Sequence, residues 1–197
     1  MNISPKQFSV NFCSKQNFKN LNCVHFTPIG AISTDGHGFI VIPYPASADP
    51  ETIPTWENPV LVPADDCKLA ATFFKACRTP GVSSMQFGVD GIRFESADKR
   101  WMALKRFIPE PSSILDFRKV LETGNETPVS DSTLFTDSLF LRVTKQLVSC
   151  CKRDNGIKVS IVTSISSGGP CFKLATIDTN PAFAVLLARR QAHELEL

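Results

Sequence analysis

The chain is poor in the residues that build metal sites. It has only His25, His37 and His193, with no HxH or HExxH spacing, and its seven cysteines include no CxxC pair. A zinc site needs three or four nitrogen, sulfur or oxygen ligands brought together, so the sequence predicts no metal and no cofactor. The odd cysteine count also favours buried, reduced thiols over a disulfide scaffold, as expected of a cytoplasmic protein.

Long apolar runs and a large excess of one charge are missing too. No run approaches the roughly 18 apolar residues of a membrane-spanning helix. The opening residues, MNISPKQFSVNF, lack the charged-then-apolar order of a signal peptide. We therefore expect a cytoplasmic protein that makes no membrane contact. The formal net charge is only +2, which by itself does not predict binding to nucleic acid.

The chain does have the apolar content for a sizeable core. It is 197 residues long and 43% hydrophobic, enough for one domain or two small ones. Near the N-terminus two interpretations stay open, because Phe8, Val10 and Phe12 alternate as in a strand, whereas Ser4-Pro5 is typical of a helix start. Further along, apolar and β-branched runs predict strands at 21–26, 31–34, 38–44, 59–63, 84–89, 91–96, 101–107, 157–165, 171–177 and 183–188.

Two helices interrupt these strands. Helical spacing of apolar residues predicts them over about 65–78 and 136–151, each with an aspartate or a threonine as its N-cap. Polar, proline-bearing connections are expected at 45–59 and 108–132. The order strand–helix–strand–strand–strand therefore recurs two or three times, which indicates a repeated architectural unit.

The stretch AISTDGHGFIVIP places Asp35 and His37 two residues apart, each followed by a glycine. β-Prone runs flank the Asp-Gly pair, which is a strong signal for a hairpin turn. Gly36 and Gly38 are expected to supply the positive φ angles of that turn. A hydrolase that uses Asp35 and His37 is the competing interpretation, but no partner motif accompanies it. The sequence favours the turn and assigns no catalytic residue.

Both predicted helices carry basic side chains opposite their apolar faces. Apart from aspartates in the first turn, neither helix contains an acid. Solvated helix faces usually mix charges of both signs, so a basic stripe on both helices favours contact with phosphate, although a solvated face would explain either stripe alone. The residues of the two stripes are Lys68, Lys75 and Arg78 in the first helix and Arg142, Lys145 and Lys152 in the second.

Four motifs, taken in order, resemble the bacterial DNA polymerase III β subunit, the sliding clamp. Ser33–Ile40 stands where that family has ATDGHRLA, and Val60–Pro63 matches a V.VP strand that leads into a helix. The stretch ILDFRKVL at 114–121 occupies the place of the linker FPDYRRVLP, and AFAVLLAR at 182–189 that of the closing strand AYVVMPMR. The resemblance extends over about 20–190.

The resemblance implies an α+β protein of the DNA clamp fold, with repeated β-α-β-β-β units and helices on one face of curved antiparallel sheets. It implies a two-unit domain over 1–122 and a one-unit partial domain over 123–197. A clamp is not an enzyme: it holds double-stranded DNA without reading its sequence and tethers a DNA polymerase or another replication or repair protein. The basic stripes would then face DNA, and the protein would form a homo-oligomer.

The same resemblance implies a cleft for partner proteins. In clamps the TDGH hairpin forms one rim of a hydrophobic cleft that holds partner peptides, and the linker and the closing strand form the rest. The alternative is that the apolar residues of these segments are ordinary core. The corresponding residues here are His37, Gly38, Phe39, Leu115, Lys119, Val120, Ala184, Leu186, Ala188 and Arg189.

The chain is short for this family. A bacterial clamp protomer has three domains of two units each, whereas this sequence has about three units in all. Ring closure is therefore not implied, and a second hypothesis stays open: a clamp-derived interaction module, or clamp competitor, that does not encircle DNA. An unpaired strand edge for assembly is expected near 84–96 or in the third unit.

Overall fold

A computed structural model describes residues 8, 10–15, 20–77, 82–110, 115–121, 123–126, 137–150, 157–164, 170–177 and 182–187. The helices are α1 (Ala64–Ala76), α2 (Phe117–Leu121) and α3 (Asp137–Cys150), with 3-10 turns η2 (Val10–Phe12) and η3 (Pro50–Thr52). The strands are β1 (Cys23–Thr27), β2 (Gly30–Thr34), β3 (Gly38–Ile42), β4 (Val60–Pro63), β5 (Val82–Gly88), β6 (Gly91–Ser96), β7 (Trp101–Lys105), β8 (Thr123–Glu126), β9 (Ile157–Ser164), β10 (Pro170–Thr176) and β11 (Phe183–Leu187).

The described strands form two antiparallel sheets. The larger has eight strands in the order β4-β1-β2-β3-β11-β10-β9-β8, and the smaller has the order β5-β6-β7. At the centre of the larger sheet β3 pairs with β11, so that Phe39 lies opposite Val185 and Ile40 opposite Ala184. The larger sheet therefore runs on from the predicted domain 1–122 into 123–197, and the division at that boundary stays a prediction.

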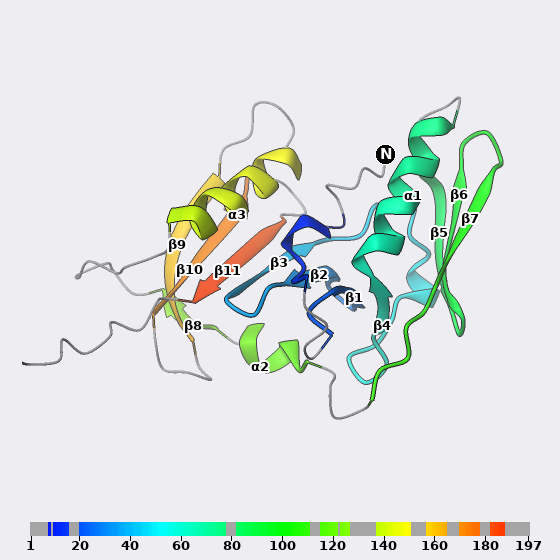
Figure 1. The fold of residues 1–197 in the computed structure, drawn as a ribbon. Helices are drawn as coiled ribbons and strands as arrows, with labels where there is room; N and C mark the ends of the chain where they lie inside the picture. The colour runs from blue at the N-terminus through cyan, green and yellow to red at the C-terminus, as the bar shows by residue number, and fades with distance from the viewer. Residues whose placement is uncertain are drawn as a thin grey trace, which may run out of the picture.

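Two long helices cover the same face of the eight-stranded sheet. Residues directly opposite each other on antiparallel strands share a face, and the pairs Phe26–Ala31, Ala31–Ile42 and Ile40–Ala184 mark one such row. The buried side of α1 packs near the β1–β2 end of this row and that of α3 near the β3–β11 end. Figure 1 shows α3 over β9, β10 and β11, and α1 beside the smaller sheet.

The N-terminal segment is neither a strand nor a long helix in its described part. Residues 10–12 form the 3-10 turn η2, and the side chains of Phe8, Val10 and Phe12 are all buried. Phe8 and Val10 belong to the core under α1, whereas Phe12 belongs to the core under α3. The alternating apolar residues of this segment are all buried, but they pack into two adjacent cores and not on one face of a sheet. The same alternation would be expected of a strand.

The opposite face of the large sheet is covered by α2, which the sequence did not predict. The region 108–132 was expected to be a polar connection, but it contains both α2 and the edge strand β8. The ring of Phe117 packs against Phe39 and His25 at centroid distances of 6.2 and 5.1 Å. A five-residue helix shows too little of the 3.6-residue period to stand out in a sequence. The expectation of helices on one face therefore holds for α1 and α3 but not for α2.

The start of α1 differs from the expected capping. The helix begins at Ala64, directly after β4, and its N-cap is Pro63, which makes no side-chain capping hydrogen bond. Asp65 and Asp66 lie in the first turn instead, where a negative charge still interacts favourably with the helix dipole. None of the described helices has the length and apolar content to cross a membrane.

His25 is the titratable group that should dominate the acid sensitivity of this core. Its ring is buried, its Nε2 donates to the Asn20 carbonyl at 3.1 Å, and burial lowers its pKa to about 4 from the usual 6.5. Below pH 6.5 the unfolded chain binds a proton that the folded chain binds only near pH 4. Stability should therefore fall as the pH drops from about 6.5 to about 4, by roughly 3 kcal/mol in total.

Urea unfolding of the parent protein and of His25→Leu between pH 7.5 and 4 measures this effect. The carboxylates contribute equally to both proteins, so the difference between their free energies of unfolding isolates His25. Between pH 7.5 and pH 4 we expect the free energy of unfolding of the parent to fall by roughly 3 kcal/mol more than that of His25→Leu. A difference that does not change with pH would show that His25 does not resist protonation.

Candidate nucleic-acid interface

The exposed sides of α1 and α3 form the surface that the sequence assigned to DNA. In α1, Lys68 and Lys75 are exposed, and in α3, Arg142 and Lys145 are exposed. Because both helices cover one face of the same sheet, their four basic side chains belong to one side of the molecule. The other two residues of the predicted stripes, Arg78 and Lys152, lie outside the described residues.

Two of these four cations are paired with carboxylates. The Nζ of Lys68 lies 2.7 Å from the Asp65 carboxylate, three residues earlier in α1. Arg142 forms an ion pair with Asp35 in the β2–β3 turn, and its guanidinium lies 4.6 Å from the Phe12 ring centroid. Arg142 therefore fixes α3 to the turn and to η2, and its charge is largely balanced there.

Lys75 and Lys145 carry the remaining positive charge. Both side chains are exposed, and neither makes an ion pair with a carboxylate of the described residues. One lies in the last turn of α1 and the other in the middle of α3. Exposed ammonium groups without a paired acid are what sequence-independent contact with phosphate requires.

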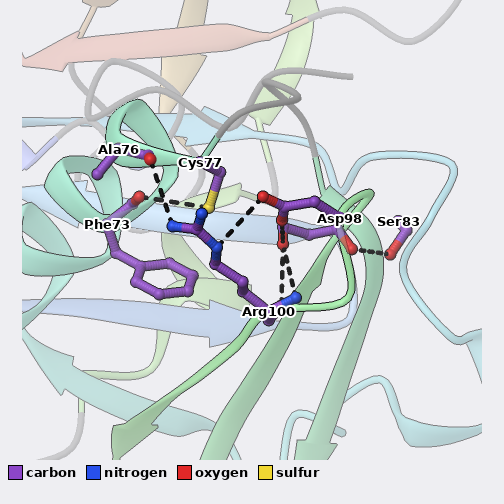
Figure 2. Close-up of polar contacts among 7 residues, drawn as sticks. Phe73, Ala76, Cys77, Ser83, Asp98 and Arg100 are labelled. Carbon is purple, nitrogen blue, oxygen red and sulfur yellow. Dashed lines mark hydrogen bonds and ion pairs between the residues drawn. The ribbon is translucent and has the colours of Figure 1, made fainter.

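The end of α1 that carries Lys75 is held by the β6–β7 turn (Figure 2). Nη1 of Arg100 donates to the Ala76 carbonyl at 3.4 Å, and Nε of Arg100 lies 3.3 Å from the Asp98 carboxylate. Ser96 Oγ accepts from the Arg100 amide and donates to Asp98. An arginine at a helix C-terminus satisfies a carbonyl that has no partner within the helix, so this turn fixes the last turn of α1.

The stretch TDGH is a turn, as its sequence predicted. Oδ1 of Asp35 accepts from the His37 amide at 3.0 Å, and Gly36 has a φ of +91°. The expectation of a positive φ at Gly38 was wrong. A Cβ at Gly38 would stand 2.9 Å from both the Val185 carbonyl oxygen and a Leu186 methyl group, so glycine is needed there because β11 approaches closely.

The three segments of the predicted partner cleft meet on the α2 face through Phe39, Leu115 and Val185, but not all of the predicted residues lie there. Phe39 is buried on the α2 face of the sheet with the half-buried Leu115. Ala184 and Leu186 are buried on the other face, under α3. His37 is exposed and Gly38 is buried in the sheet. Their roles in partner binding stay predictions. The side chains of Lys119 and Val120, and all of Ala188 and Arg189, lie outside the described residues.

The edge expected near 84–96 is not open in the described residues. β6 is the middle strand of its sheet, and the outer edge of β5 bonds to the chain before it: the Met85 amide donates to the Ser47 carbonyl, and the Asp49 amide to the Met85 carbonyl. In the described part of the chain the other edge of this sheet is β7, and the third-unit edge is β8. Oligomerisation stays a prediction.

No described group of three histidine, cysteine or acidic side chains could hold a metal ion. Cys13, Cys23, Cys67, Cys77 and Cys171 form no disulfide with one another. Burial raises the pKa of Cys13 to about 12 and that of Cys23 to about 11. The thiols of Cys13 and Cys23 therefore stay protonated at neutral pH, which does not suit a nucleophile.

Comparison with known proteins supports the fold and goes no further. No family model and no curated protein matches the sequence. A solved structure of the DNA polymerase III β subunit from Thermotoga maritima matches 98% of this chain with a TM-score of 0.50 and 9% sequence identity. The match covers 65% of that chain, so this protein spans less than two thirds of the β subunit. The chain therefore has a clamp-like fold.

Proposed function

We propose that this protein is a clamp-like tethering factor that holds duplex DNA through sequence-independent phosphate contacts on the α1–α3 side. The observation that carries this proposal is the placement of α1 and α3 on one face of one sheet, with Lys75 and Lys145 exposed and unpaired with any described carboxylate. The partner that it tethers would be a DNA polymerase or another replication or repair protein. No residue is assigned a catalytic role.

Binding of two labelled duplexes of unrelated sequence, each of about 30 base pairs, tests this proposal. Phosphate contacts do not report base identity, so we expect equal dissociation constants for the two duplexes at low salt. A clear preference for one sequence would contradict contact through phosphates alone. No binding to either duplex at low salt would contradict the DNA role.

A second candidate is an interaction module with the same fold that does not hold DNA. Two observations favour it: the ion pairs at Lys68 and Arg142 reduce the positive charge of this side, and both helices expose apolar side chains. Leu69, Leu141 and Val148 are each more than half exposed, and such residues suit a protein partner better than phosphate. Failure of DNA binding by a folded protein would favour this candidate.

A further inference from the structure

The smaller sheet carries a groove of about 670 Å³ at the end where β5 turns into β6. On the outer face of the sheet, Gly88 lies opposite Gly91, and Ala103 lies opposite Arg93. The two glycines and the alanine carry nothing larger than a methyl group, and Arg93 and Lys105 lie beside them on the same face. The small residues at these positions therefore produce the groove. Its volume is within the range of pockets that hold ligands.

The groove has exposed apolar side chains at its rim and more basic than acidic residues in its lining. Val89 and Ile108 line it and are 87% and 83% exposed. Its lining includes Arg93, Lys105 and Arg106 but only one acid, Asp90. No described carboxylate forms an ion pair with any of these three cations.

Arg93 and Lys105 are exposed at the groove, and Arg106 is half-buried beside them. The guanidinium of Arg93 lies 5.3 Å from the ring centroid of Trp101, which is 60% exposed. Nη2 of Arg106 donates to Asn58 Oδ1 at 2.6 Å and to the Pro59 carbonyl at 3.1 Å. Both acceptors are neutral, so Arg106 is positioned without being neutralised. Lys105 is exposed at the edge of the sheet.

We propose that this groove binds an acidic, extended segment of a partner protein, with one apolar side chain of that segment over Gly88 and its carboxylates beside Arg93 and Lys105. Exposed valine and isoleucine are poor neighbours for a phosphate backbone but good ones for an apolar anchor. A second copy of the chain would bring the same positive surface to the groove. The groove is separate from the α1–α3 side and does not depend on DNA binding there.

Gly88 makes the groove testable without disturbing the fold. A Cβ at Gly88 would meet nothing nearer than the Gly91 carbonyl oxygen at 4.0 Å, so a larger side chain fits the strand but fills the groove. Gly88→Leu is therefore the blocking variant. Ser84→Leu is the matched control, because Ser84 lies on the same face of β5 and does not line the groove. Lys105→Glu reverses one charge at the rim.

The experiment is selection of random twelve-residue peptides displayed on phage against the whole protein, followed by affinity measurement with the enriched peptides. We expect enrichment of Asp or Glu together with Leu, Ile, Val or Phe, and at least tenfold weaker binding to Gly88→Leu and to Lys105→Glu. Ser84→Leu should bind as the parent does.

Four outcomes would overturn the proposal. They are no enrichment, enrichment of basic or neutral peptides, equal binding of the peptides to the parent and to Gly88→Leu, and displacement of the peptide by a single-stranded oligonucleotide. Sedimentation of the parent and of Gly88→Leu adds a fifth. If the parent self-associates and the variant does not, the groove belongs to a second copy of the chain.

Discussion

Leu186→Asp is expected to unfold the protein rather than to remove a partner-binding contact. Leu186 is fully buried, and it packs under α3 with Val143 and Leu147. Its side chain also lies against Gly38, where β11 meets β3. A carboxylate buried there would have no partner and no water, so we expect the free energy of unfolding to fall by at least about 4 kcal/mol. Urea unfolding followed by circular dichroism measures the loss.

Val148→Asp is the matched control for that variant. Val148 is on the exposed side of α3 and is 57% exposed, so the same carboxylate there should change the free energy of unfolding by less than about 0.5 kcal/mol. A Leu186→Asp protein as stable as its parent would contradict the core position of Leu186. It would also return this residue to the predicted cleft.

The double variant Lys75→Glu, Lys145→Glu is expected to lose most of the affinity for duplex DNA. Both side chains are exposed on the α1–α3 side and make no ion pair with a described carboxylate. Each lost phosphate contact removes the release of about one counterion. Two contacts should therefore weaken binding by about tenfold or more near physiological salt. Fluorescence anisotropy with a labelled duplex measures the change.

The control for this charge reversal is Arg93→Glu with Lys105→Glu, which changes the net charge of the protein equally but on the smaller sheet. If both double variants weaken DNA binding to the same extent, the effect comes from overall charge and not from the α1–α3 side. Circular dichroism should show that both variants are folded, because all four side chains are exposed.

The sequence predicted the strands and the two long helices well, because the spacing of apolar residues along each of them follows the period of a strand or a helix. All ten predicted strands overlap strands of the structure, and the predicted helices overlap α1 and α3. The short elements were missed because they show no hydrophobic periodicity. The helix α2 has only five residues, and the sequence of β8, TGNE, contains no apolar side chain. That the β-α-β-β-β units are repeats stays a prediction.

The site was harder to predict, because its key contacts join residues far apart in the chain. Asp35 and Arg142 are separated by 107 positions, and nothing local to either residue indicates the ion pair. Leu186 and Phe39 both appeared as apolar residues of one cleft. The register of β3 with β11 sends their side chains to opposite faces, and a sequence does not show the register between distant strands. The groove on the smaller sheet arises from two glycines and an alanine, which no motif marks.

The most direct test of DNA holding by the α1–α3 side is the salt dependence of duplex affinity, between about 50 and 200 mM salt. The logarithm of the association constant should fall linearly with the logarithm of salt concentration. We predict that the slope becomes shallower by about two units in Lys75→Glu, Lys145→Glu, because each phosphate contact contributes about 0.9. An unchanged slope in that variant, or a parent protein that does not bind duplex DNA at the lowest salt, would contradict this function.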